Sequence, residues 1–230
     1  EYNRGLNTSS NTNFPDNTVR GVKYNGLDML LIGKVSGDAS NLGNEIAVFY
    51  LREAQIVNLS RSVQVVYDSS SDPNGLALKS VGVEMFTISN ANQNSDLKAT
   101  STSNFYSSQA NGTISTPAIT SSANSLIITG ITSGNNTAQY SVSSSSGFST
   151  PLVRNFNNHS YASSSKTIPL ASTETPAFNI NTTSTRVAML SFMVDPISAL
   201  PIDLSYFKAR SSEGMVKLSG PLPRRKIMRS

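Results

Sequence analysis

Residues 186–194, with the sequence RVAMLSFMV, do most to indicate the fold of this chain. The odd positions from Val187 carry Val, Met, Ser and Met, and the even positions from Ala188 carry Ala, Leu, Phe and Val. These two alternating sets predict a strong β-strand, the last of the chain. Asp195 and Pro196 follow, and we expect the strand to end there because proline has no backbone N–H to donate.

Other runs before this one predict further strands. Asn25-Gly26 separates the first two, and this pair predicts a two-residue hairpin because both residues tolerate positive φ. Glu45 to Gln55 is the nearest approach to a helical pattern, and its end, Glu53 to Gln55, is expected to turn helically. Roughly eight to ten short strands separated by turn residues predict a sandwich or barrel. The predicted runs are Val19 to Tyr24, Leu27 to Lys34, Glu45 to Arg52, Ser62 to Asp68, Leu76 to Ser89, Ser125 to Thr132, Ala138 to Val142 and Lys166 to Leu170.

The composition removes several classes of protein. Ser, Asn and Thr make up 82 of the 230 residues, while charged residues are only 14%. The chain has no Cys and one His, which excludes disulfides, thiolate metal sites and a zinc site with two histidines from one chain. We therefore expect no cofactor and no metal. No run of 18 apolar residues occurs, so we expect no membrane-spanning helix.

Charge is distributed unevenly along the chain. Residues 1–206 carry a net charge of −2, whereas residues 207–230 carry +6. Between Lys98 and Arg154 there is no charged side chain. Such a surface suits a protein that is packed in an assembly or that works outside the cell. The chain does not begin with Met and lacks a basic-then-apolar leader, so we expect a processed or trimmed product.

The order of these segments resembles a jelly-roll, lectin-like sandwich module that is common in phage virion and tail proteins and in secreted bacterial proteins. The resemblance covers roughly residues 15–195, and it implies an all-β fold: an antiparallel two-sheet jelly-roll sandwich with extended N- and C-terminal arms. Gly147-Phe148-Ser149 stands where such modules often have Gly-Trp-Thr. The segments that carry the resemblance are Val19 to Gly26, Ile46 to Leu51, Ser62 to Tyr67, Gly82 to Phe86, Asn124 to Ile128 and Val187 to Phe192.

We expect three parts: an N-terminal arm at residues 1–14, the jelly-roll sandwich at 15–206, and a basic C-terminal arm at 207–230. Pro196 and Pro201 suggest that the sandwich is complete by Val194. The arm mixes cations with apolar residues, which favours docking on an acidic protein neighbour. Contact with nucleic acid phosphates and a solvated tail are the alternatives. Its cations are Lys208, Arg210, Lys217, Arg224, Arg225, Lys226 and Arg229.

Few residues are candidates for a ligand site. Aromatic residues in polar, charge-poor segments can form a sugar-binding face, or they can belong to the core or to a subunit interface. They are Tyr140, Phe148, Phe156 and Tyr161. Asp68, Asp72 and Asn74 have the oxygen ligands of a calcium loop, but Asp-Pro-Asn-Gly is also a common turn sequence.

Catalytic chemistry has little support in the sequence. His159 is more typical of a surface loop than of a nucleophilic triad, and no Gly-x-Ser-x-Gly motif occurs. Glu45, Glu53 and Glu84 are possible glycosidase carboxylates, with ion pairs or an outward-facing side chain as the plainer alternatives. The sequence therefore predicts a non-enzymatic structural protein of a phage virion, such as a capsid decoration, head or tail surface protein. Its expected partners are other copies of itself and neighbouring virion proteins, with a virion or extracellular location. The alternative is a carbohydrate-binding module for a host or cell-surface glycan.

Overall fold

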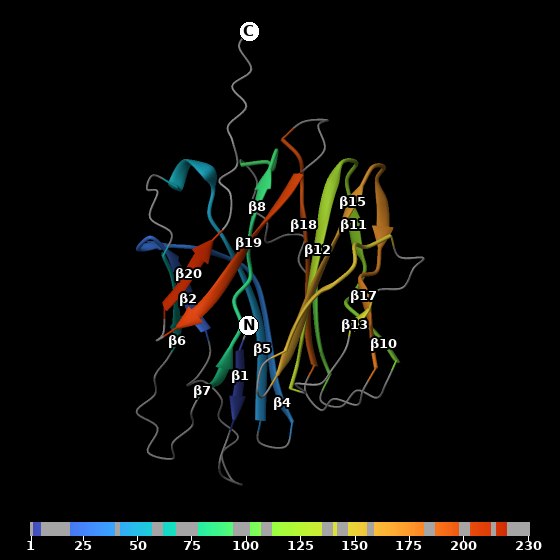
Figure 1. Cartoon of the computed structure of the whole chain (residues 1–230). Helices are drawn as coiled ribbons and strands as arrows, with labels where there is room; N and C mark the ends of the chain where they lie inside the picture. Colours follow the sequence, from blue (N-terminus) through green and yellow to red (C-terminus); the bar gives the residue numbers. More distant parts are fainter. Residues whose placement is uncertain are drawn as a thin grey trace.

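The computed structural model of the chain is all-β, and its described residues contain antiparallel strands and no α-helix (Figure 1). One 3-10 turn, η1 (Glu53–Gln55), lies where the sequence predicted a helical turn. No helix in the described part of the chain is long and apolar enough to cross a membrane. The structure describes residues 2–5, 19–39, 42–56, 62–67, 78–93, 102–106, 112–134, 140–141, 147–155, 159–181, 187–197, 203–212 and 215–219.

A five-stranded sheet lies at the centre of the fold, in the order β14-β15-β12-β18-β9. Its strands are β14 (Leu152–Asn155), β15 (Ser160–Ile168), β12 (Ser125–Ser133), β18 (Val187–Val194) and β9 (Thr102–Tyr106). Every residue of β18 is buried, and so is every residue of β12 except Gly130. Side chains alternate between the two faces of a strand, so burial of all of them means that both faces of this sheet are covered.

Two sheets lie on one side of the central sheet. One has the order β4-β5-β1-β7, with β4 (Leu30–Ala39), β5 (Leu42–Tyr50), β1 (Tyr2–Gly5) and β7 (Leu78–Val81). The other has the order β3-β2-β6-β20-β19-β8, with β3 (Leu27–Asp28), β2 (Val19–Tyr24), β6 (Ser62–Tyr67), β20 (Met215–Ser219), β19 (Asp203–Ser212) and β8 (Met85–Ser89).

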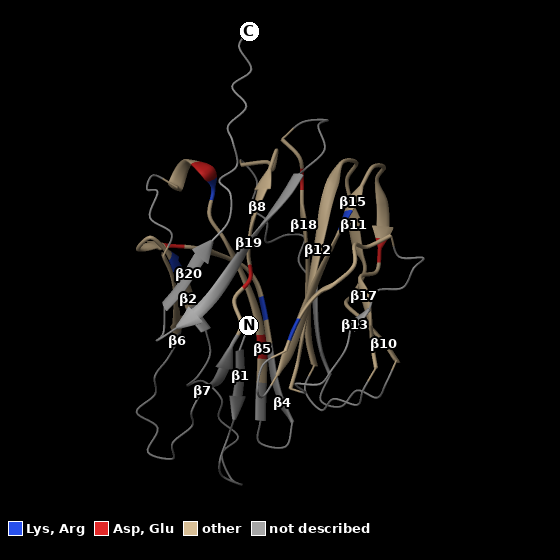
Figure 2. Cartoon of the chain, in the orientation of Figure 1, with Lys and Arg blue, Asp and Glu red and all other residues tan. Residues whose placement is uncertain are grey.

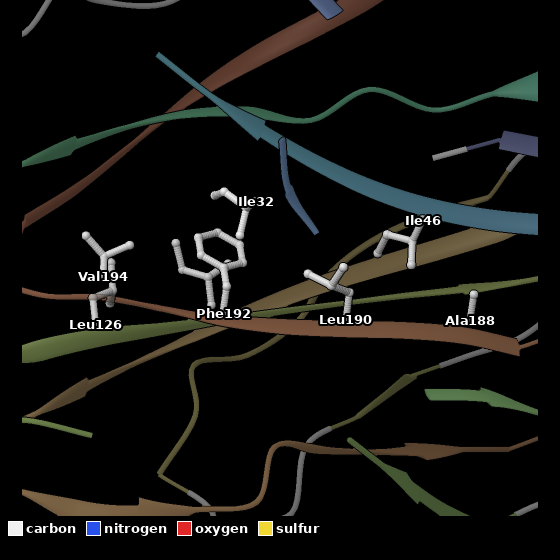
Figure 3. Packing of buried hydrophobic residues seen from close by; sticks show 8 residues of the cluster. Ile32, Ile46, Leu126, Ala188, Leu190, Phe192 and Val194 are labelled. Carbon is white, nitrogen blue, oxygen red and sulfur yellow. The ribbon is translucent and has the colours of Figure 1, made fainter. Parts of the chain in front are cut away.

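Apolar side chains join this side to the central sheet. Ile32 of β4 and Ile46 of β5 point towards Leu190 and Phe192 of β18 (Figure 3). Phe86 of β8 stacks on Phe192, with ring centroids 6.5 Å apart. Burial of such side chains is the main favourable term in folding, at about 1.5–3 kcal/mol each. The even-numbered residues of β18 therefore form the interface with the sheets on this side.

The opposite face of the central sheet is covered by two small sheets, which we call the outer layer (Figure 1). One has the order β10-β17-β13, with β10 (Gly112–Ser115), β17 (Ala177–Ile180) and β13 (Tyr140–Ser141); the other pairs β11 (Ile119–Ser121) with β16 (Ser172–Glu174). Phe178 and Ile114 pack with Met189 in one apolar cluster, and Ile119 packs with Met193 in a second. The odd-numbered residues of β18 thus meet the outer layer.

A buried hydroxyl bridge connects the outer layer to the central sheet. Ser191 Oγ of β18 lies 2.9 Å from Thr129 Oγ1 of β12 and 2.9 Å from Thr116 Oγ1, which follows β10. All three residues are at most 2% exposed. Buried polar groups are normally hydrogen-bonded, and here the hydroxyl of Ser191 is the hydrogen-bond partner of both threonine hydroxyls.

Several strand predictions are confirmed. Asn25 and Gly26 have φ of 51° and 82°, and they join β2 to β3 as the hairpin rule requires. Leu76 to Ser89, in contrast, is divided into β7 and β8. The coarse prediction of an antiparallel all-β fold is confirmed as well. The layers differ from a simple two-sheet sandwich because β12 and β18 bear apolar side chains on both faces.

The strands also extend further along the chain than we expected. Pro196 follows β18, yet residues 203–212 and 215–219 form β19 and β20. β19 pairs with β8 and with β20, and β20 pairs with β6 through Val216 and Val63. The boundary that we expected at residue 207 therefore falls inside β19, in a sheet of the fold.

Candidate functional site

A pocket of about 170 Å³ lies between the central sheet and the layers that contain β2, β5, β6 and β8. Its described lining is apolar except for a few side chains, of which Glu84 is the only charged one. Lining residues such as Val22, Met29 and Phe49 are only half-buried, so the pocket is accessible from solvent. The lining consists of Val22, Met29, Ile46, Ala47, Val48, Phe49, Val63, Val65, Gly82, Val83, Glu84, Met85, Phe86, Ile128, Thr129, Gly130, Tyr161, Ala162, Ser163 and Phe192.

Glu84 belongs to the link between β7 and β8. Ser163 Oγ donates a hydrogen bond of 2.8 Å to Glu84 Oε1. Burial raises the pKa of this carboxyl group above its usual range, and the hydrogen bond from Ser163 and the charge of Arg154 offset part of that rise. The surroundings of Glu84 therefore solvate its negative charge poorly. A cation or a hydrogen-bond donor in the pocket would stabilise the charged carboxylate.

The pairing of β15 explains how its side chains reach the pocket. Ser163 lies opposite Gly130 of β12, and Tyr161 lies two residues earlier on the same face of β15. A Cβ atom on Gly130 would lie 2.9 Å from Ile46 Cδ1. The absence of a side chain at Gly130 therefore allows β5 to approach β12 at the wall of the pocket.

The three glutamates that we considered as catalytic carboxylates lie in three different environments. Glu45 is 1% exposed and its Oε2 lies 3.8 Å from Lys34 Nζ. Glu53 is exposed at the start of η1, and its backbone N–H donates to Gln93. Glu84 lines the pocket. The ion pair expected for Glu45 involves Lys34, a residue that the sequence pattern did not single out.

His159 corrects a prediction. The sequence suggested a surface loop, but His159 is fully buried. It directly precedes β15, an internal strand of the central sheet between β14 and β12, and this position explains its burial. Nearby, Thr132 Oγ1 of β12 donates to Asn44 Oδ1 at 3.3 Å, so polar side chains from several strands are buried in this part of the fold.

The predicted aromatic face is only partly described. Phe148 is 9% exposed and packs in the cluster with Ile119, while Lys166 Nζ lies 5.8 Å from the centre of its ring. Tyr161 is 6% exposed and lines the pocket. Tyr140 lies in β13 and its backbone pairs with Ile180 of β17, and Phe156 lies outside the described residues. Of the four aromatic residues, the two whose side chains are described are thus buried rather than displayed on the surface.

The predicted cations and metal ligands are similarly divided. Lys208 and Arg210 lie in β19, and Lys217 lies in β20. Outside the described residues lie Arg224, Arg225, Lys226 and Arg229, together with Asp68, Asp72 and Asn74. Among the residues that are described, no three His, Asp or Glu side chains are grouped so that they could hold a metal ion.

The outer layer carries almost no charge. Among the residues of its five strands, Glu174 is the only charged one. Its Oε2 lies 2.7 Å from Lys166 Nζ of β15, so the charge is neutralised within the chain. Burial disfavours ionisation of Glu174, but hydrogen bonds from Lys166 and Ser172 outweigh it and lower the pKa. Figure 2 shows the described residues of this layer almost entirely uncharged.

Comparison with known proteins gives no relative: no family model matches the chain, and no curated protein or solved structure matches it significantly.

Proposed function

We propose that this chain is a non-enzymatic structural protein of a phage virion, that two of its layers form a jelly-roll type of sandwich to which the outer layer is added, and that copies of it associate through the outer layer. The observation that supports the proposal is the near absence of charge on that layer. Its exposed side chains include Thr113, Thr120 and Thr173, and Leu170 beside it is 76% exposed. Such a surface offers hydroxyl and apolar contacts to a partner.

Electrostatics explains why this surface suits association. Charged surfaces keep protein molecules apart and cost desolvation energy when they are buried in an interface. The described strands of the outer layer present little of either obstacle, because their one carboxylate, Glu174, already pairs with Lys166. Hydroxyl side chains, in contrast, can replace their hydrogen bonds to water with hydrogen bonds to a partner across an interface. A virion subunit must remain associated with its neighbours, and a layer of this kind meets that need.

The test compares two lysine substitutions at exposed strand positions. Thr120→Lys adds a charge to the outer layer, and Gln64→Lys adds the same charge to β6 on the other side of the molecule. Light scattering over a range of concentrations and electron microscopy of the purified protein measure assembly. We expect the wild type and Gln64→Lys to form the same oligomers, and Thr120→Lys to remain dissociated. A wild type that stays monomeric at high concentration and is absent from intact particles would overturn the proposal.

A further inference from the structure

We propose that the pocket beside Glu84 binds a small apolar molecule that carries a primary ammonium group. This inference goes beyond the structural role proposed above and does not depend on it. It rests on three features of the pocket: its size, its apolar walls, and the single carboxyl group in its described lining.

The size of the pocket sets the size of the ligand. Well-packed interiors contain few voids larger than a water molecule, and a dry apolar cavity of about 150 Å³ is large enough to hold a benzene ring. The pocket here is of similar volume, about 170 Å³. Its walls come from Val22, Val63 and Val65 on one side and from Ile128 and Phe192 on the other. One aromatic ring or a short alkyl chain therefore fits this space.

The negative charge of Glu84 determines which polar group the ligand should carry. Glu84 Oε1 accepts from Ser163, and a carboxylate has further acceptor positions to offer. A carboxylate removed from water is costly unless a cation or donors compensate it. An ammonium group supplies one positive charge and three N–H donors from a single atom. A ligand with a carboxylate of its own would instead meet like charge.

The neighbouring ionisable groups leave this role to a ligand. Tyr161 of β15 lines the pocket as well. Arg154 of β14 acts on Glu84 through its charge, while its Nη1 donates to the carbonyl oxygen of Val153 at 3.0 Å. Among the described lining residues there is no Lys, Arg or His. A ligand that enters the pocket would therefore supply a cation that the described lining lacks.

The experiment measures binding of three ring-sized probes to the purified full chain by calorimetry: benzylamine, benzyl alcohol and benzoate. The variants are Glu84→Gln, which keeps the shape but removes the charge, and Glu53→Gln, the same change at an exposed position. We expect wild type and Glu53→Gln to bind benzylamine, and Glu84→Gln to bind it about tenfold more weakly or worse. Benzyl alcohol should bind more weakly than benzylamine, and benzoate should not bind.

Several results would overturn the inference. Failure of benzylamine to bind the wild type, equal affinity for benzylamine and benzyl alcohol, or an unchanged affinity in Glu84→Gln would each do so. Circular dichroism of Glu84→Gln verifies that the variant is folded. The wild type gives a second readout that needs no variant: benzylamine should bind more weakly as the pH falls and Glu84 becomes protonated. An affinity for benzylamine that stays constant as the pH falls would also contradict the inference.

Discussion

Substitution of Ser191 by Ala removes the centre of the hydroxyl bridge between the outer layer and the central sheet. Two hydrogen bonds of 2.9 Å are lost, and Thr116 and Thr129 are left with hydroxyls that are buried. Each buried hydroxyl without a partner costs about 1–3 kcal/mol. We therefore expect the free energy of unfolding to fall by about 2–4 kcal/mol, a large share of the stability of an ordinary domain.

Urea unfolding followed by circular dichroism and Tyr fluorescence measures this change, since the chain has no Trp. A triple variant, Ser191→Ala with Thr116→Val and Thr129→Val, removes all three hydroxyls and keeps their shapes. It should unfold within about 1 kcal/mol of the wild type, because no polar group is then left without a partner. Thr120→Val is the exposed control. A loss below about 0.5 kcal/mol in Ser191→Ala, typical of surface positions, would refute the reasoning.

Three further predictions concern stability and pH. Gly26→Ala should lower the free energy of unfolding by about 1–2 kcal/mol, because Gly26 has a φ of +82°. Gly21→Ala, in a strand with open space around Gly21, should lower it less, and the urea midpoints of the two variants compare them. Glu84→Gln should stabilise the protein at neutral pH, because the raised pKa of Glu84 in the folded state makes the stability of the wild type fall as pH rises. The gain in stability should vanish below the pKa that Glu has in the unfolded chain. A gain that persists in acid would contradict this prediction. Lys166→Met should cost about 1 kcal/mol or less at neutral pH. Since the folded pKa of Glu174 is lowered, that difference should disappear as pH falls through it, and thermal melts of both proteins over a pH series would show whether it does.

Strong local patterns predicted the strands that they mark. The hairpin at Asn25-Gly26 follows from backbone sterics alone, and it is present. The apolar runs that became β6, β12 and β18 are equally clear, because burial of such side chains outweighs other preferences. The apolar residues on both faces of β18 agree with the layers that cover it on each side, since a strand with one solvated face alternates apolar and polar residues. We predicted only two sheets, so the third layer was not foreseen.

Other strands have no such pattern. β15 has the sequence SYASSSKTI, and the predicted strand Lys166 to Leu170 overlaps only its end. The serines before Lys166 hid the rest of the strand, although Ser160 and Ser164 are buried. Small hydroxyl residues suit a strand between two close layers because they occupy little space and can donate to neighbouring oxygens. β19 and β20 were missed because the prolines after β18 suggested an end, while their pairing with β8 and β6 depends on contacts far apart in sequence.

The pocket could not have been predicted from the sequence. Glu84 and Ser163 are 79 positions apart, and only the packing of the layers brings them together. Glu84 was considered only as one of several carboxylates, and Ser163 was one of many serines. The near absence of charge in the outer layer was visible in the sequence, in contrast, since most of that layer lies between Lys98 and Arg154.

Hydrogen exchange of the dissociated and the assembled protein, followed by mass spectrometry, tests the proposed assembly surface most directly. Peptides that cover β11 and β16 of the outer layer should exchange more slowly in the assembly, because a neighbouring copy excludes water from their amides. Peptides from β2 and β3, on the other side of the molecule, should exchange at the same rate in both states. An assembly in which β11 and β16 exchange as they do in the dissociated chain would contradict the proposal.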